Sequence, residues 1–242
     1  MSVKIANPAV WKKDIPDRLI AYLSGNLPDR WKELSTGIIP RSAQALLAIA
    51  LGRLLKRNVV LITDNPMSLD LVHQDLLTLS DDKYHRPLYF PPHELLGRTG
   101  GSLQDTNAAG HRLDTLLALA GESPDIPEDL LTVTATCIQA LMQRTVSCQN
   151  LKKLTVRIKT GETCEPVRLS KDLVNACYVH SQEVDEEGHF CVKGGILDVW
   201  PLNNLWPLRI EFTGDVVASI RFFDPATQKS VNKTSIALIP PA

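Results

Sequence analysis

The chain lacks the apolar segments of a membrane protein or an exported protein. Its most apolar run, residues 43–55, is interrupted by Gln44, Gly52 and Arg53, whereas a membrane span needs roughly 18 or more uninterrupted apolar residues. The N-terminal residues 1–8 contain no apolar stretch of the secretory-signal kind. We therefore expect a cytoplasmic protein that does not enter a membrane.

Strong net charge and paired cysteines are also missing. The formal net charge of the 242 residues is -1, so we expect little or no direct DNA binding. The five cysteines form no C-x-x-C pair, which argues against a zinc or redox site and favours reduced, structural thiols. They are Cys137, Cys148, Cys164, Cys177 and Cys191. We predict no cofactor and no metal.

Motifs for catalysis are absent as well. Residues 37–42 (Gly-Ile-Ile-Pro-Arg-Ser) precede a predicted helix, where a nucleotide-binding domain has its phosphate loop. The second glycine and the lysine of G-x-x-x-x-G-K-[ST] are missing, however, and Pro40 removes a backbone N–H donor. His73, His93 and His111 lack the H-E-x-x-H spacing, and no serine lies in a G-x-S-x-G elbow. We therefore predict that this chain is not an enzyme.

The sequence does contain an alternation of helical and strand patterns over residues 1–150. Apolar periodicity predicts helices at 15–23, 42–56, 66–79, 106–120 and 136–144. Short apolar runs predict strands at 58–63, 87–90 and 129–134, and the β-branched run 58–63 suits a buried parallel strand. A glycine-rich loop is expected at 97–105. Strands and helices that alternate at this spacing predict an α/β domain with a mainly parallel sheet.

The pattern changes near residues 149–152, and residues 151–242 predict a second, smaller domain. One helix is expected at 170–178 with Ser170 as its N-cap. Strands are expected at 153–159, 179–184, 190–200, 208–213, 216–223 and 235–239. The predicted fold class is therefore α/β, with a mainly parallel domain followed by a mainly antiparallel α+β domain.

Three segments of the second domain carry the most information: residues 189–201, 207–212 and 220–228. Because side chains alternate along a strand, Ile210 and Phe212 point to a core face, while Arg209, Glu211 and Thr213 point to the opposite, polar face. A polar sheet face meets water or a partner.

Two adjacent glycines, Gly194 and Gly195, interrupt the first of these segments. Adjacent glycines weaken a strand and often mark a bulge. We interpret them as a bulge that keeps the strand in register with the core and sets the angle of Lys193 toward a partner.

These segments, in this order, resemble the N-terminal region of the bacterial transcription-repair coupling factors, and more distantly that of UvrB. The family pattern reads roughly G-x-F-x-x-R-G-x-[IL]-x-D-[IL]-[FW]-P, then P-x-R-[IL]-[DE]-F-F, then [IL]-R-x-F-D-x-x-[ST]-Q-[RK]. The matching segments here are residues 188–201, 207–213 and 220–229. The resemblance covers essentially the whole chain, but it is strong only from residue 130 onward and weak before residue 55.

The resemblance implies a degenerate P-loop-like domain over residues 1–150 and a domain that binds UvrA over residues 151–242. The expected function is recruitment of UvrA in nucleotide excision repair by a non-catalytic module. Chains of this family continue into an RNA-polymerase-binding domain and a DNA translocase. This chain therefore looks like part of a longer one, with RNA polymerase as an indirect partner.

The resemblance also implies site residues. In the family, UvrA contact runs through the arginine of F-x-x-R, the arginine of R-[IL]-[DE]-F-F and the last aromatic of that motif, which match Lys193, Arg209 and Thr213. Lys193 keeps the charge without the planar fork of arginine, and Thr213 lacks an aromatic anchor. We add Glu211 as a residue that orients Arg209 or excludes wrong partners. An Arg209 turned inward, or locked in internal salt links out of a partner's reach, would contradict this interpretation.

Two alternatives remain open. A UvrB-like nucleic-acid-binding or helicase-accessory fragment would bind DNA tightly and in a salt-sensitive way, although the phosphate loop and the aromatic-rich hairpin that it needs are not evident. An unrelated α/β enzyme with a site at the domain boundary would be stabilised by its nucleotide.

Overall fold

The computed structural model describes residues 17–22, 24, 39–80, 85–93, 106–123, 126, 127 and 130–242. The described residues of 1–92 and 124–144 form one unit, and those of 93–123 and 145–242 form a second. The second unit thus takes in residues 106–119, which the sequence pattern grouped with the first domain; the predicted boundary at residue 150 remains a proposal. The predicted loop 97–105 and the phosphate-loop candidate residues Gly37 and Ile38 lie outside the described residues.

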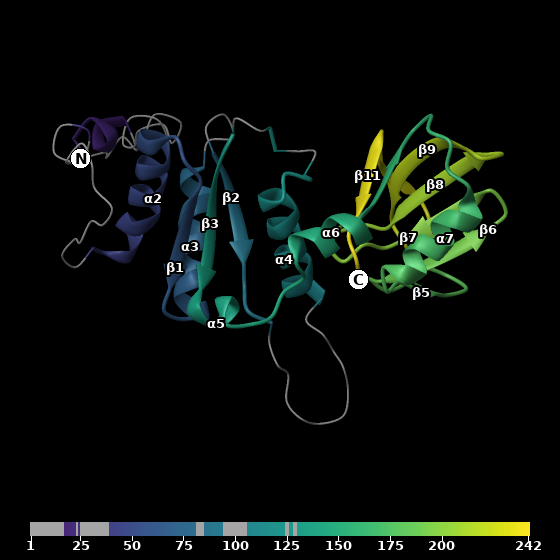
Figure 1. The fold of residues 1–242 in the computed structure, drawn as a ribbon, viewed down its shortest axis with the longest axis horizontal. Coiled ribbons are helices and arrows are strands. Elements are labelled where there is room, and N and C mark those ends of the chain that lie inside the picture. The colour runs from purple at the N-terminus through teal and green to yellow at the C-terminus, as the bar shows by residue number, and fades with distance from the viewer. Residues whose placement is uncertain are drawn as a thin grey trace, which may run out of the picture. The chain divides into compact units, whose positions relative to one another are not determined.

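The first unit contains a parallel sheet with helices packed on it (Figure 1). Its strands β1 (Val59–Thr63), β2 (His85–Phe90) and β3 (Leu131–Cys137) lie in the order β1-β3-β2, and β3 pairs in parallel with both neighbours. Helices α2 (Arg41–Leu55) and α3 (Pro66–Leu79) pack on this sheet, and α5 (Ile138–Leu141) follows β3 directly. Residues 17–22 are helical, as predicted. The predicted parallel sheet with alternating helices is confirmed.

Local signals fix the start of α3. Asn65 is extended, and its side chain accepts a hydrogen bond from the Ser68 N–H at 2.8 Å, while Pro66 occupies the first helical position. Strand β1 agrees less well with its prediction. It lies at the end of the described sheet, and Val60 and Ile62 are 54% and 52% exposed, so the expectation that this strand is buried is wrong for one of its faces.

The second unit is built on a six-stranded sheet of order β10-β9-β8-β7-β6-β5. Figure 1 labels β5 to β9 of this sheet. The strands are β5 (Val179–His180), β6 (His189–Lys193), β7 (Ile196–Val199), β8 (Leu208–Thr213), β9 (Val216–Phe223) and β10 (Ser230–Thr234). All neighbours pair antiparallel except β5 and β6. Strands β4 (Val156–Lys159) and β11 (Ile236–Ile239) form a separate antiparallel pair. The mainly antiparallel character predicted for this part is confirmed.

The described residues of the second unit include helices α4 (Thr106–Leu119), α6 (Cys148–Leu154) and α7 (Pro166–Asn175). The apolar side of α7 is buried together with one face of the large sheet and with the β4–β11 pair. This core contains Ile158, Leu169, Leu173, Leu197, Ile210, Ile220 and Ile239, each at most 2% exposed. The opposite face of the large sheet is therefore the face left for polar side chains.

Helix assignments in the second unit need correction. The sequence pattern predicted one helix with Ser170 as N-cap, but α7 begins at Pro166, and the Ser170 hydroxyl donates to the Pro166 carbonyl from inside the helix at 2.9 Å. The short helix α6 was missed, although Ser147 caps it by accepting from the Asn150 N–H. Within the described residues, no helix is long and apolar enough to cross a membrane.

The interpretation of Gly194 and Gly195 as a bulge is wrong. They form the two-residue turn of a β6–β7 hairpin, in which Lys193 pairs with Ile196. Gly194 has φ +61°, a conformation that glycine adopts without strain and that two-residue hairpin turns require. The predicted strand 190–200 is thus two strands. Strand β10 was also missed, because its residues are mostly exposed and show no apolar alternation.

Candidate partner-binding face

The outer face of the large sheet carries a row of polar side chains across four strands. The strand register aligns Asp198 of β7 with Arg209 of β8, Arg221 of β9 and Lys233 of β10. Aligned residues of neighbouring strands point to the same face. The adjacent row aligns Lys193 of β6, through Ile196 of β7, with Glu211 of β8 and Ser219 of β9. We call these two rows the polar face.

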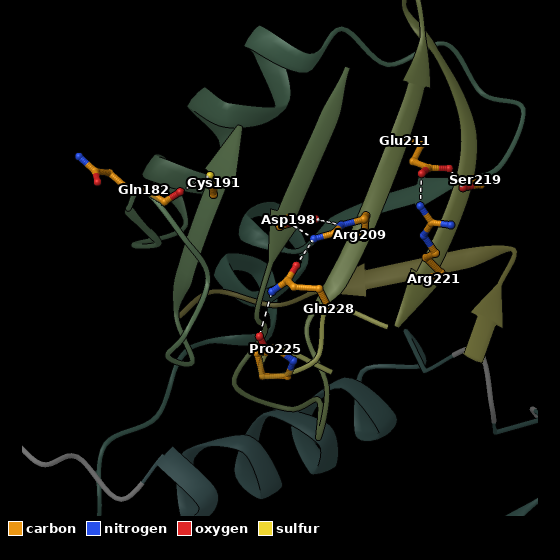
Figure 2. A network of polar contacts seen from close by, with 9 residues as sticks. All are labelled: Gln182, Cys191, Asp198, Arg209, Glu211, Ser219, Arg221, Pro225 and Gln228. Carbon is orange, nitrogen blue, oxygen red and sulfur yellow. Dashed lines mark hydrogen bonds and ion pairs between the residues drawn. The ribbon is translucent and has the colours of Figure 1, made fainter. Parts of the chain in front are cut away.

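Two arginines lie directly opposite each other in this row, and like charges in that position repel. Each arginine has its own acidic partner. Arg209 donates from Nε and Nη2 to the two carboxylate oxygens of Asp198, both at 2.8 Å (Figure 2). Arg221 pairs with Glu211, which also accepts a hydrogen bond from the Ser219 hydroxyl at 2.6 Å. The face is therefore a set of paired charges.

Arg209 is held by more than its carboxylate. Its Nη2 also donates to Oε1 of Gln228 at 2.7 Å, and the guanidinium carbon lies 4.3 Å from the centre of the Phe223 ring. Phe223 is buried although it lies on the outer side of the sheet, so the guanidinium helps to cover it. The hydrogen bonds to Asp198 raise the pKa of Arg209 further, against a smaller lowering by burial.

The turn after β9 places Gln228. Asp224 accepts hydrogen bonds from the N–H groups of Ala226 and Thr227 and from the Thr227 hydroxyl, and these bonds lower the pKa of Asp224. Gln228 has φ +59°, and its N–H donates to the Asp224 carbonyl at 2.7 Å. Its side-chain Nε2 donates to the Pro225 carbonyl at 2.9 Å, which directs Oε1 toward Arg209 (Figure 2).

Lys193 lies at one end of the sheet, on the last residue of β6. Its side chain is 61% exposed, and its Nζ is 3.7 Å from a carboxylate oxygen of Glu183, which is exposed as well. Lys193 also lines an open groove of about 580 Å³ formed by residues 180–183 and 191–193. Cys191 lies in this groove but is largely buried; its Sγ donates to the Gln182 carbonyl, and burial raises the pKa of the thiol.

The structure changes the roles assigned from sequence. Arg209 is 18% exposed and most of its donors are used internally, so it is not a free anchor. Arg209 is locked in an internal salt link, so the recruitment prediction now requires a contact to Arg209 that leaves this link in place. Asp198, and not Glu211, orients Arg209, because Glu211 binds Arg221 and Ser219.

Lys193 and Thr213 remain the exposed members of the predicted set. Thr213 ends β8 beyond a register shift between Glu211 and Phe212.

Sequence reasoning missed Asp198, Arg221, Phe223 and Gln228 as parts of this site. Gln228 was visible as the glutamine of the last family motif, but its contact with Arg209 depends on the strand register. Among the described residues, no group of three or more His, Cys, Asp or Glu side chains could hold a metal ion.

Comparison with known proteins concerns the part of the chain that carries this face. Residues 156–242 match the family model of the UvrB interaction domain. The chain is 29% identical over 202 residues to the transcription-repair-coupling factor of Bacillus subtilis, a match that covers 83% of this chain and 16% of the relative. It is 34% identical over 129 residues to that of Myxococcus xanthus, covering 53% and 10%.

A third match, to the transcription-repair-coupling factor of Haemophilus influenzae, is 35% identical over 104 residues and covers 43% of this chain and 9% of the relative. The chain thus spans a small part of the length of each relative. Residues 156–242 are thus similar to the UvrB interaction domain, and the chain is similar to part of the transcription-repair-coupling factors.

Proposed function

We propose that this chain is a non-catalytic module that binds UvrA through the polar face and thereby recruits it for nucleotide excision repair. The observation that carries the proposal is the match of residues 156–242 to the UvrB interaction domain. The polar face supports it, because α7 and the β4–β11 pair cover the other face of the same sheet.

The exposed charge on this face is the part that a partner meets first. Lys193 has one long contact to an exposed carboxylate, and such surface pairs contribute roughly 0–1 kcal/mol. Its charge is therefore available for an acidic group of UvrA. The paired charges of Asp198, Arg209, Glu211 and Arg221 fix the shape of the face, and complementary charge in the partner sets register and association rate.

Charge reversal tests the proposal. Lys193→Glu is expected to weaken binding of purified UvrA by roughly tenfold, about 1.4 kcal/mol, because it places a carboxylate beside Glu183 and opposite an acidic partner group. The matched control is Lys171→Glu. Lys171 is also exposed, but it belongs to α7, which packs against the opposite face.

Binding is measured by calorimetric titration of the chain into UvrA, and folding of each variant is checked by thermal unfolding. A wild-type chain that does not bind UvrA contradicts the proposed function. Equal affinities of the two variants contradict the choice of the polar face.

A further inference from the structure

Arg209 has five N–H donors, and not all of them are engaged in hydrogen bonds within the chain. Nε donates once and Nη2 donates twice, to Asp198 and Gln228. Nη1 has no hydrogen-bond partner within the described part of the chain, and this nitrogen is accessible to solvent. The two N–H groups of Nη1 are therefore the donors that remain for a partner.

Three contacts of the guanidinium group determine the orientation of its Nη1 edge. Asp198 grips one edge of the guanidinium at two atoms, which fixes its plane. Phe223 lies under that plane. Gln228 accepts from the last N–H of Nη2, and the Asp224 turn holds Gln228 in its own unusual backbone conformation. A donor held in this way loses little further side-chain freedom when a partner binds it.

We propose that Gln228, together with Asp198, is a positioning residue that holds Arg209 so that its Nη1 edge presents two N–H groups to an oxygen acceptor of the protein partner. This proposal rests on the proposed function and deepens it. It gives Arg209 a contact that does not require its internal ion pair to break. It also explains why a glutamine five residues beyond β9 belongs to the site.

Asp198 balances the charge of Arg209, so removing it would leave a partly buried cation without a partner and would disturb folding. Gln228 is the better residue to test, because it is exposed and carries no charge. Gln228→Asn keeps a residue that tolerates positive φ, but its shorter side chain does not reach Nη2.

The experiment is a double-mutant cycle read by UvrA affinity. The variants are Gln228→Asn, Arg209→Lys and the double variant. Arg209→Lys keeps a positive charge and an aliphatic stem over Phe223 but has no Nη1 edge. In the wild-type background, Gln228→Asn is expected to weaken UvrA binding three- to tenfold, because one of the three contacts that hold the guanidinium is lost. In the Arg209→Lys background the same change is expected to alter affinity less than twofold, because there is no edge left to position.

Thermal unfolding of all four proteins separates positioning from a general effect on folding. If Gln228 has only a structural role, Gln228→Asn lowers the melting temperature and changes UvrA affinity by the same factor in both backgrounds, or does not change affinity in either. Each of these two results overturns the proposal. If the unsubstituted chain does not bind UvrA, the proposed function fails and this inference fails with it. If the chain binds and Gln228→Asn has no effect, only the positioning inference is overturned.

Discussion

The substitution Gly110→Ala tests whether α4 belongs to the second unit. Gly110 lies on the buried side of α4, where the helix approaches the loop that follows β7. A Cβ at this position would lie 2.2 Å from the carbonyl oxygen of Leu202 and 3.1 Å from its carbonyl carbon. The neighbouring Asn203 donates a side-chain hydrogen bond to Asp114 of α4 at 2.9 Å, so the loop is tied to the helix at the point of closest approach.

Two effects of this substitution oppose each other. Alanine in a helix interior is more stable than glycine by about 1 kcal/mol. Against this, an oxygen at 2.2 Å must move by about 1 Å to reach ordinary contact, and it belongs to backbone that cannot rotate away. Overpacking of this kind costs about 1–3 kcal/mol or more, and the shift also strains the Asn203–Asp114 hydrogen bond. Because the clashing oxygen is a backbone atom, the cost lies at the upper end of this range, about 2–3 kcal/mol, and we expect a net loss of about 1–2 kcal/mol.

The free energy of unfolding is measured by urea titration, followed by circular dichroism and tryptophan fluorescence. The denaturation midpoint is expected to fall without a change in slope. The matched control is Gly52→Ala in α2, where a new Cβ meets nothing nearer than 3.2 Å and stability should change by less than about 1 kcal/mol. A Gly110→Ala variant that equals or exceeds the wild type in stability refutes the contact between α4 and residue 202.

Two further predictions concern the second unit. Cys177 is exposed and follows Ala176, the C-cap of α7, with φ +71°, and its N–H donates to the Val174 carbonyl. Cys177→Gly should raise the free energy of unfolding in a urea titration by about 0.5–1 kcal/mol, because glycine adopts this conformation without strain. The folded-state pKa of Asp224 is depressed below its ordinary value of 3.8, mainly by the Thr227 hydroxyl. Its contribution to stability is therefore complete above 3.8 and lost as the pH falls through the folded pKa, and Thr227→Val should move the Asp224 pKa upward in an NMR titration; an unchanged pKa would contradict the hydrogen bond.

Periodicity was sufficient to predict most elements. Strands β8 and β9 and helix α3 have the predicted bounds, because each combines a clear apolar pattern with turn or cap residues at both ends. Strand β10 and helix α6 have neither a long pattern nor a large apolar face. Their formation depends on pairing and packing with residues distant in the sequence, which propensity alone does not report.

Gly194 and Gly195 show a limit of predictions from side-chain alternation. A bulge adds one residue to a strand, and a two-residue hairpin turn reverses the chain, yet both place Lys193 and Ile196 on the same side of the sheet. Alternation therefore could not distinguish them. The correct choice needed the turn chemistry of adjacent glycines, which favours a hairpin.

The pairing of Arg209 with Asp198 could not be predicted, because the alignment of β7 with β8 cannot be read from the sequence. Sequence alternation placed Arg209 on the polar face correctly, but only the β7–β8 alignment brings Asp198 opposite it. A charged residue on a sheet face can be free or paired, and the cross-strand neighbour decides which.

The most direct measurement is a lysine-labelling footprint of the chain, free and bound to UvrA. Lys193 and Lys233 are exposed on the polar face, and Lys171 is exposed on α7 on the opposite side. Acetylation rates at each lysine are read by mass spectrometry. UvrA is predicted to slow acetylation of Lys193 and Lys233 and to leave Lys171 unchanged. Protection of Lys171 with full reactivity at Lys193 and Lys233 would contradict binding through the polar face.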